Sequence, residues 1–155
     1  MALFGALSRP LSDNVTATAG LRWEQRAARY RDNYDSRFNP RDNMLGGELG
    51  LTREVQPGTT VWARIARGYK AGGFNTSLAG IDFSEFPDFS LDAGNIEYDP
   101  EYLWDYEVGL RMAPPGAGWT MALSFFVQER DDPQIKVPVQ LRLGDPTTYV
   151  FVTDN

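Results

Sequence analysis

The sequence predicts an all-β protein, an antiparallel up-and-down meander of about six to seven strands. The first observation behind this prediction is a period-two alternation of apolar and polar residues in every segment with a clear pattern. The second is that short turns rich in Pro, Gly, Asn and Asp alternate along the chain with long polar connections. In an antiparallel meander this rhythm places the short turns at one end of the sheet and the long loops at the other.

The first clear strand covers residues 15–24, and the turn before it is expected at "SRPLSDN", residues 8–14. One face of this strand carries Val15, Ala17, Ala19, Leu21 and Trp23, and the other carries Thr16, Thr18, Gly20, Arg22 and Glu24. A weaker alternation over residues 45–52 sets leucines against Glu48. Both segments therefore predict strands with one apolar and one polar face.

Three further strands are expected at residues 60–70, 102–112 and 119–128, with turns at "EVQPGT" (54–59) and "APPGAG" (113–118). The second of these strands alternates most cleanly, with Tyr102, Trp104, Tyr106, Val108, Leu110 and Met112 opposing Leu103, Asp105, Glu107, Gly109 and Arg111. The third presents Trp119, Met121, Leu123, Phe125 and Val127 on one face, with Phe126 the exception on the other.

Long polar links are expected over residues 27–43 and 72–99 and from residue 129 onward. In the tail, residues 131–155, "IKVPVQLRL" and "TTYVFVTDN" both read as extended segments. Pro138 lacks a backbone donor and favours an edge strand or a loop. We expect these two segments to form a hairpin within the last long loop.

Composition excludes several classes of protein. The chain has no Cys and no His, which removes disulfides, thiol or imidazole metal sites and nucleophiles that depend on a His base. A net charge of -6 and a pI near 4.6 argue against nucleic-acid binding. No segment approaches the roughly 18 apolar residues of a membrane helix. The sequence predicts neither an enzyme nor a cofactor or metal site.

Charged side chains in the middle of strands suggest a water-filled lumen rather than a dry sandwich, which makes the apolar face the lipid-facing one. The lumen-facing candidates are Arg22, Glu24, Glu48, Asp105, Glu107 and Arg111. The lipid-facing candidates are Val15, Leu21, Trp23, Trp104, Tyr106, Val108, Leu110, Met121, Leu123 and Phe125. Trp23, Trp62, Tyr102, Trp104 and Trp119 near strand ends are expected to form aromatic girdles. A soluble β-fold is equally compatible with the pattern alone.

The stretch "GYKAGGFN", residues 68–75, lacks the G-K-[ST] ending of a phosphate loop. We interpret it as a strand exit, in which Gly68 relieves crowding on the sheet while Gly72 and Gly73 supply positive φ. Asp105, Glu107 and Arg111 share one face of a strand. They fit either glycosidic acid/base chemistry or, more commonly, a salt-bridge network. "DDP" with Glu129 offers oxygen ligands for Ca²⁺, although a solvated loop is the commoner reading.

Two longer motifs carry a family resemblance. "VWARIARGYKAGGFN" (61–75), followed by "YDPEYLWDYEVGLR" (98–111), resembles the paired motif of TonB-dependent outer-membrane receptors. There, a strand ending in G-Y-K-A-G-G-F-N precedes a long loop, then P-E and an aromatic-rich strand ending E-x-G-x-[KR]. "FGALSRPLSDNVTATAGLRWE" and "MALSFFVQERDDPQI" resemble the flanking segments in the same order.

The resemblance implies a transmembrane barrel of about 22 strands in the Gram-negative outer membrane, closed by a plug domain. It also implies a TonB partner, recruited through an N-terminal box, and uptake of an iron-siderophore complex or another bulky solute such as cobalamin or an oligosaccharide. Residues 1–155 would be an internal part of that barrel, without the plug. Loop aromatics are the candidate ligand contacts, namely Phe83, Phe86, Phe89 and Tyr98.

Two alternatives remain open at this point. The first is a soluble all-β carbohydrate-binding or carbohydrate-active domain, in which aromatics would stack on sugar and the Asp105/Glu107 pair would matter. The second is a small barrel that inserts into membranes alone. Solubility in water and insertion into liposomes separate the three readings.

Overall fold

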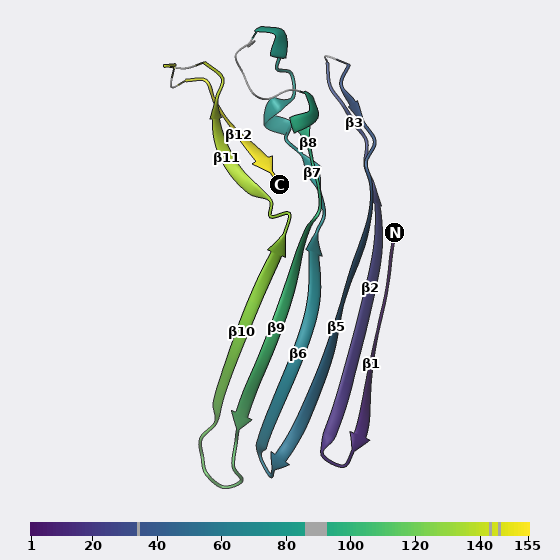
Figure 1. Ribbon diagram of the computed structural model, residues 1–155, viewed down its shortest axis with the longest axis vertical. Helices are drawn as coiled ribbons and strands as arrows, with labels where there is room; N and C mark the ends of the chain where they lie inside the picture. Colours follow the sequence, from purple (N-terminus) through teal and green to yellow (C-terminus); the bar gives the residue numbers. More distant parts are fainter. Residues whose placement is uncertain (34, 86–92, 143, 146) are drawn as a thin grey trace. The chain divides into compact units, whose positions relative to one another are not determined.

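Six long strands form one sheet in the structure, a computed structural model that describes residues 1–33, 35–85, 93–142, 144, 145 and 147–155. The strands are β1 (Ala2–Ser12), β2 (Val15–Ala27), β5 (Arg41–Gln56), β6 (Thr59–Lys70), β9 (Glu101–Met112) and β10 (Met121–Asp131). They lie side by side in the order β1-β2-β5-β6-β9-β10, so spatial order follows chain order (Figure 1). The expected all-β antiparallel meander is confirmed.

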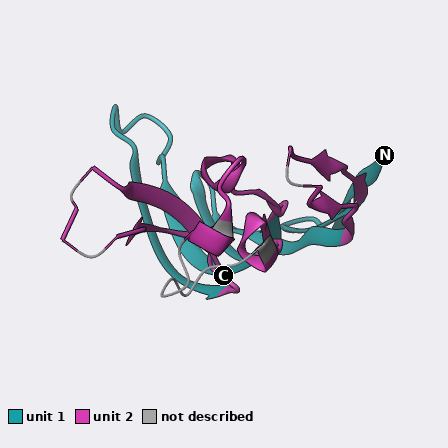
Figure 2. Cartoon of the chain, turned by 90° about the horizontal axis from the view of Figure 1, so that it is seen from above, with its two compact units in different colours: residues 1–24, 44–69, 102–130 teal, residues 25–43, 70–101, 131–155 magenta. Residues whose placement is uncertain are grey.

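The chain divides into two compact units (Figure 2). Unit 1 contains most of the six-stranded sheet, in Met1–Glu24, Met44–Tyr69 and Tyr102–Arg130. Unit 2 consists of Gln25–Asn43, Lys70–Glu101 and Asp131–Asn155, which correspond to the long connections expected from sequence.

Turn positions differ from expectation in three places. The turn expected at residues 54–59 is confined to Pro57 and Gly58, because β5 continues to Gln56 and β6 begins at Thr59. β1 continues through Pro10 to Ser12, so the first turn is confined to Asp13 and Asn14 rather than to residues 8–14. Pro10 pairs with Thr16 at an irregularity of the β1–β2 register between Pro10 and Ser12, and such irregularities are positions where a strand accepts a proline. β10 begins at Met121, two residues later than expected, because Gly116 and Gly118 with positive φ extend the turn.

The sheet of unit 1 separates its side chains into two faces. The polar face carries Arg22, Glu48, Arg64, Asp105, Glu107 and Gln128. The apolar face carries Leu3, Leu7, Leu21, Leu49, Ile65, Val108 and Phe125. Directly paired residues support the division, since Leu3 pairs with Trp23 and Leu49 with Ile65. Apolar-face side chains are widely exposed, with Leu21 at 61% and Phe125 at 67%.

Unit 2 has a small hydrophobic core of its own. Leu78, Ile96 and Val152 are buried, and Phe74, Tyr30, Phe38, Ile81, Val139 and Val150 pack against them. The surrounding elements are the short hairpin strands β3 (Tyr30–Arg31) with β4 (Arg37–Phe38), β7 (Gly73–Phe74) with β8 (Glu97–Tyr98), and β11 (Ile135–Gln140) with β12 (Tyr149–Asp154). The last pair confirms the hairpin expected in the tail, in which Pro138 faces Phe151.

Short 3₁₀ helices complete unit 2: η1 (Thr76–Leu78), η2 (Phe83–Glu85) and η3 (Ala93–Ile96). In the described part of the chain, no helix has the length and apolar character needed to cross a membrane.

The glycines of "GYKAGGFN" have a different role from the expected one. Neither Gly72 nor Gly73 has a positive φ. A Cβ at Gly72 would lie 2.4 Å from the Tyr98 carbonyl oxygen, and one at Gly73 would lie 2.3 Å from the Tyr98 hydroxyl. The two glycines are therefore needed for close approach to β8. A Cβ at Gly68 would meet no atom within 4 Å, so the expectation of relieved crowding there is wrong.

Candidate functional site

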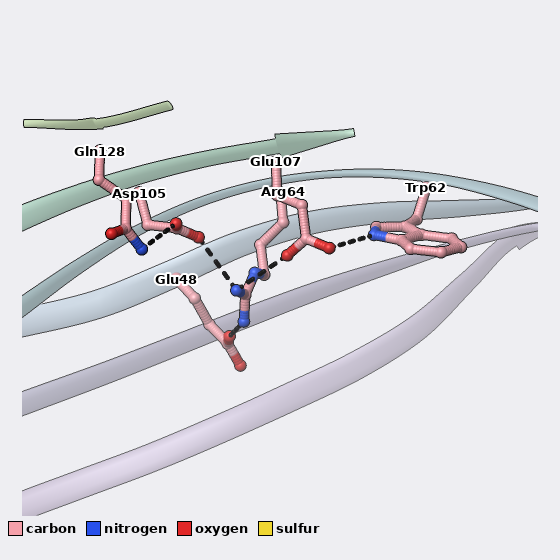
Figure 3. Close-up of polar contacts among 6 residues, drawn as sticks. All are labelled: Glu48, Trp62, Arg64, Asp105, Glu107 and Gln128. Carbon is pink, nitrogen blue, oxygen red and sulfur yellow. Dashed lines mark hydrogen bonds and ion pairs between the residues drawn. The ribbon is translucent and has the colours of Figure 1, made fainter. Parts of the chain in front are cut away.

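A charged cluster on the polar face is centred on Arg64, which projects from β6 (Figure 3). Its Nη2 donates to Asp105 Oδ2 at 3.0 Å and to Glu107 Oε2 at 3.1 Å, both on β9. Its Nη1 lies 3.9 Å from Glu48 Oε2 on β5. Gln128 on β10 donates to Asp105 Oδ1 at 3.0 Å. One guanidinium therefore joins three carboxylates from two neighbouring strands.

Trp62 also belongs to this cluster, and the position of its side chain differs from the expected one. Its indole N–H donates to Glu107 Oε1 at 3.2 Å, so the ring lies on the polar face and not in a lipid-facing girdle (Figure 3). A Cβ at Gly109 would lie 2.1 Å from the Trp62 ring. The missing side chain at Gly109 leaves the space in which the indole lies flat against β9.

A second polar group on the same face joins Arg22 and Glu24 on β2 to Tyr69 on β6. Arg22 Nη2 lies 2.7 Å from Glu24 Oε2, and Arg22 Nε donates to the Tyr69 hydroxyl at 2.8 Å. That hydroxyl donates to Glu24 Oε2 at 3.0 Å. The paired register of β5 and β6 ends at Gly47 and Arg67, so Tyr69 lies beyond the regular ladder and its hydroxyl reaches the polar face.

The structure thus brings five of the six lumen-facing candidates into two clusters, one formed by Glu48, Asp105 and Glu107 and the other by Arg22 and Glu24. Arg111 has the same alternation as Glu107 on β9 but lies beyond Gly109, towards the end of the strand. Arg64 was missed because residues 60–70 alternate imperfectly. Its even-numbered position, shared with Trp62 and Ala66, was the sequence signal that could have placed it on the polar face.

In unit 2, the residues that follow "GYKA" are packed against the other loops. The Phe74 ring lies 5.1 Å from the Tyr30 ring, which lies 5.9 Å from Phe38. Arg26 pairs with Asp42 at 2.7 Å and donates to the Gly72 carbonyl. These contacts join the first long connection to the second.

Asn75, the last residue of the motif, is a buried clamp with 5% exposure. Its Nδ2 donates to the carbonyls of Asn95 at 2.7 Å and Thr153 at 2.8 Å, and its Oδ1 accepts from the Thr153 N–H at 2.7 Å. The Asn75 N–H donates to the Ile96 carbonyl. One amide therefore holds η3 and β12 together, where an aspartate or leucine could not satisfy the same partners.

The second motif is held by two amides from the tail. Gln134 Nε2 donates to the carbonyls of Ala71 and Asp99, and its N–H donates to Glu101 Oε2 at 3.0 Å. Asn155 exchanges hydrogen bonds with Asp99 and also donates to the Asp132 carbonyl. Sequence reasoning missed Asn75, Gln134 and Asn155, because single amides in loops have no periodic signal.

Burial raises the pKa of the Glu97 carboxyl in unit 2, and the charges of Asp99 and Asp42 raise it further against the opposing effect of Arg26. Burial also raises the pKa of Tyr30, with a smaller contribution from Asp32. No group of three or more His, Cys, Asp or Glu within the described ranges is arranged to hold a metal ion.

Of the four candidate ligand contacts in the loops, the structure describes the side chain of Tyr98 alone. Tyr98 is partly buried in β8, with its ring against Gly73. Phe86 and Phe89 lie outside the described residues, and for Phe83 the backbone alone is described, in η2. The ligand role of all four stays a prediction.

Comparison with known proteins gives one family and a set of similar folds. The family model described as TonB dependent receptor-like, beta-barrel matches residues 1–155. No curated protein sequence matches the chain. The ferric yersiniabactin uptake receptor FyuA from Yersinia pestis aligns with a TM-score of 0.66 and 22% identity, over 86% of this chain and 20% of that one. The alcaligin outer-membrane receptor FauA from Bordetella pertussis aligns with a TM-score of 0.60 and 16% identity, over 99% of this chain and 24% of that one.

Proposed function

Because the chain belongs to the TonB-dependent receptor β-barrel family, we propose that it forms part of the wall of an outer-membrane barrel that takes up a bulky, scarce nutrient. The chain spans 20% and 24% of the two receptors with which it aligns, so the remaining wall and the plug would come from elsewhere in the receptor. In this proposal residues 1–155 are one part of a single barrel domain of about 22 strands.

The observation that carries the proposal is the two-faced sheet. On one face, Leu21, Leu49 and Phe125 are more than half exposed to solvent, which is costly in water and favourable in hydrocarbon. On the other face, Arg64 and its carboxylate partners form an ion network, as expected beside a polar lumen rather than lipid. We assign the first face to lipid and the second to the lumen. The lipid-facing and lumen-facing candidates named from the sequence are assigned in the same way.

The transported solute in this proposal is a ferric siderophore. FyuA is a ferric yersiniabactin uptake receptor and FauA an alcaligin receptor by name, and both share the fold. Aromatic loop residues, including Tyr98, would contact the ligand, and the TonB complex would drive release by acting on the plug domain of the receptor. Unit 2 supports this role, because a packed loop cluster offers a preorganised binding surface.

The orientation is tested by single-cysteine labelling, for which the cysteine-free chain is well suited. Phe125→Cys and Ser124→Cys are neighbours on β10 that point to opposite faces. In the full-length receptor in liposomes, a fluorophore at residue 125 should be quenched by lipid-borne quenchers, and one at residue 124 by aqueous quenchers. The reverse result would contradict the membrane assignment, and aqueous quenching at both positions would favour a soluble β-domain.

The solute is tested by growth under iron starvation in a strain that lacks the receptor. Complementation should restore growth on a panel of ferric siderophores, and the receptor should bind the active member. Rescue by cobalamin or an oligosaccharide, without rescue by any siderophore, would keep the uptake role and reject the iron assignment. Loss of TonB should abolish uptake without abolishing binding.

A further inference from the structure

Arg67 lies on the apolar face of the sheet, unlike the charges of the polar-face clusters. It pairs with Gly47, whose Cβ direction meets Leu21. Its guanidinium carbon lies 4.0 Å from the centre of the Tyr102 ring and 5.7 Å from that of Trp104, both on β9. Its Nη1 donates to the Leu45 carbonyl at 3.0 Å. A cation is thus held by two aromatic rings among leucines.

The hydrogen-bonding capacity of Arg67 is incompletely used. Its Nε is buried without a hydrogen-bond partner, and no carboxylate in the described ranges forms an ion pair with it. Strand alternation would place the Tyr69 side chain beside it, but the Tyr69 hydroxyl is bound to Arg22 and Glu24. The charge of Arg67 therefore has no anionic partner within the described chain.

An apolar groove of about 390 Å³ adjoins this guanidinium. Its lining includes Leu21, Leu45, Leu49, Ile65, Trp104 and Arg67. Gly47 lines this groove without a side chain of its own, and a Cβ there would lie 2.6 Å from the Gly20 carbonyl oxygen and 3.4 Å from the Leu21 side chain. A groove with an apolar floor and a cation at one end complements a molecule with an acyl chain and an anionic head.

Arg67 lies near the loop end of β6. The strand from Thr59 at the short turn to Arg67 is about 26 Å long at 3.3 Å per residue. Because barrel strands tilt by about 35–45°, this length spans about 19–22 Å along the membrane normal, which is most of the apolar band of about 25 Å. Arg67 and its aromatic partners would therefore lie close to the headgroup level of the leaflet on the long-loop side, where aromatics and basic side chains meet lipid phosphates.

We propose that Arg67, Tyr102 and Trp104 form a binding site for the phosphate of a membrane lipid in the leaflet on the long-loop side, with an acyl chain of the same lipid in the groove beside Leu21 and Leu49. The forked guanidinium suits a tetrahedral phosphate, and the rings hold it in place while its charge remains available. The inference rests on the membrane orientation proposed above and adds a specific lipid site to it.

The test uses the full-length receptor in mixed micelles with lipid A or with lipid A stripped of its phosphates, and native mass spectrometry counts the lipid retained. Arg67→Gln should reduce retention of the phosphorylated lipid about fivefold and leave the stripped lipid unchanged. Arg67→Lys should fall between the two. Arg9→Gln is the matched control, because Arg9 projects from the same face beside Leu7 and Leu11 but lies near the short turn.

A measurement on the unsubstituted receptor guards against a folding defect in the variants. Lipid A should raise its melting temperature more than the stripped lipid does, and inorganic phosphate alone should not reproduce the increase. Equal retention by folded Arg67→Gln and the parent receptor, an equal loss in Arg9→Gln, or full stabilisation by inorganic phosphate would each overturn the proposal. The uptake proposal is tested separately by the cysteine labelling. If that labelling confirms the lipid-facing side, the uptake proposal stands even when the lipid site is rejected.

Discussion

The six-stranded sheet and the loop cluster of unit 2 differ in how far their apolar side chains are exposed. In the sheet, Leu21 and Phe125 are 61% and 67% exposed, whereas Leu78 and Ile96 in the loop cluster are 0% exposed. The loops thus bury their apolar groups among themselves, as a domain in water does, and the sheet leaves its own for an external apolar phase. One chain therefore contains two regions suited to two solvents.

The largest expected effect comes from emptying the loop core. Leu78→Ala should destabilise unit 2 by about 2–5 kcal/mol, because a fully buried leucine is replaced by a cavity. Hydrogen exchange of the Asn75 and Thr153 amides should accelerate, while amides in the middle of β6 stay protected. Ile135→Ala, at a 55% exposed position in the same unit, is the control and should change little. Equal acceleration in both variants would show that the loops lack an independent core.

The next test reverses the comparison by placing a charge on each face of β10. Phe125→Arg should cost about 2–4 kcal/mol of folding free energy in a bilayer, as expected for arginine near the midplane on a lipid face. Ser124→Arg, one residue earlier on the polar face, should cost much less. Denaturant titration of the receptor in vesicles measures both values. A larger loss for Ser124→Arg would mean that the faces are assigned the wrong way round.

A smaller effect is expected when the amide clamp is removed. Asn75→Ala leaves the Thr153 N–H and two carbonyls without their partner, at a cost of about 1–3 kcal/mol for buried groups. The exposed Ser77 makes one hydrogen bond to the Phe151 carbonyl, so Ser77→Ala should be milder. Limited proteolysis of the β11–β12 hairpin should show Asn75→Ala cut first. Indistinguishable cleavage of the two variants would remove Asn75 as the principal connection.

The smallest effect concerns pH and the loop cluster alone. Because the folded state raises the pKa of Glu97 above its ordinary 4.5, the contribution of this carboxyl to stability is fully present below pH 4.5 and is lost as the pH rises through the raised value. Glu97→Gln should flatten this dependence and stabilise unit 2 slightly at neutral pH. Glu85→Gln, which removes a charge from an exposed position of the same unit, is the control. The measurement is the melting temperature of the loops as a function of pH. If both variants follow the curve of the parent, this account is contradicted.

The sheet could be predicted from sequence because strand alternation is a local signal. Residues 15–24 and 102–112 define both faces without knowledge of any neighbour, and the structure confirms how they divide. Pro10 misled the turn boundary, because it lies at an irregularity of the β1–β2 register, which depends on the partner strand and not on the local sequence. Trp62 was assigned to a girdle by residue type, although its even-numbered position places it with Arg64.

The loop cluster was largely beyond prediction because its contacts are distant in sequence. Asn75 and Thr153 are 78 residues apart, and nothing near either residue indicates the other. The glycine pair at 72 and 73 was correctly identified as special but explained by φ, when the actual requirement is the Tyr98 ring and carbonyl on the facing strand. A positive φ can be expected from the local sequence of a glycine. A clash between an added Cβ and a facing strand can be expected only when that strand is known.

The outer strands β1 and β10 have one neighbour each within the described chain. Each therefore directs a row of amide hydrogens and carbonyl oxygens sideways, and in hydrocarbon every such group without a partner costs several kcal/mol. A wall of this kind cannot enter a bilayer as a separate piece. We therefore expect insertion to require further strands paired at both margins, and we expect a separate segment to associate with copies of itself through these exposed strands.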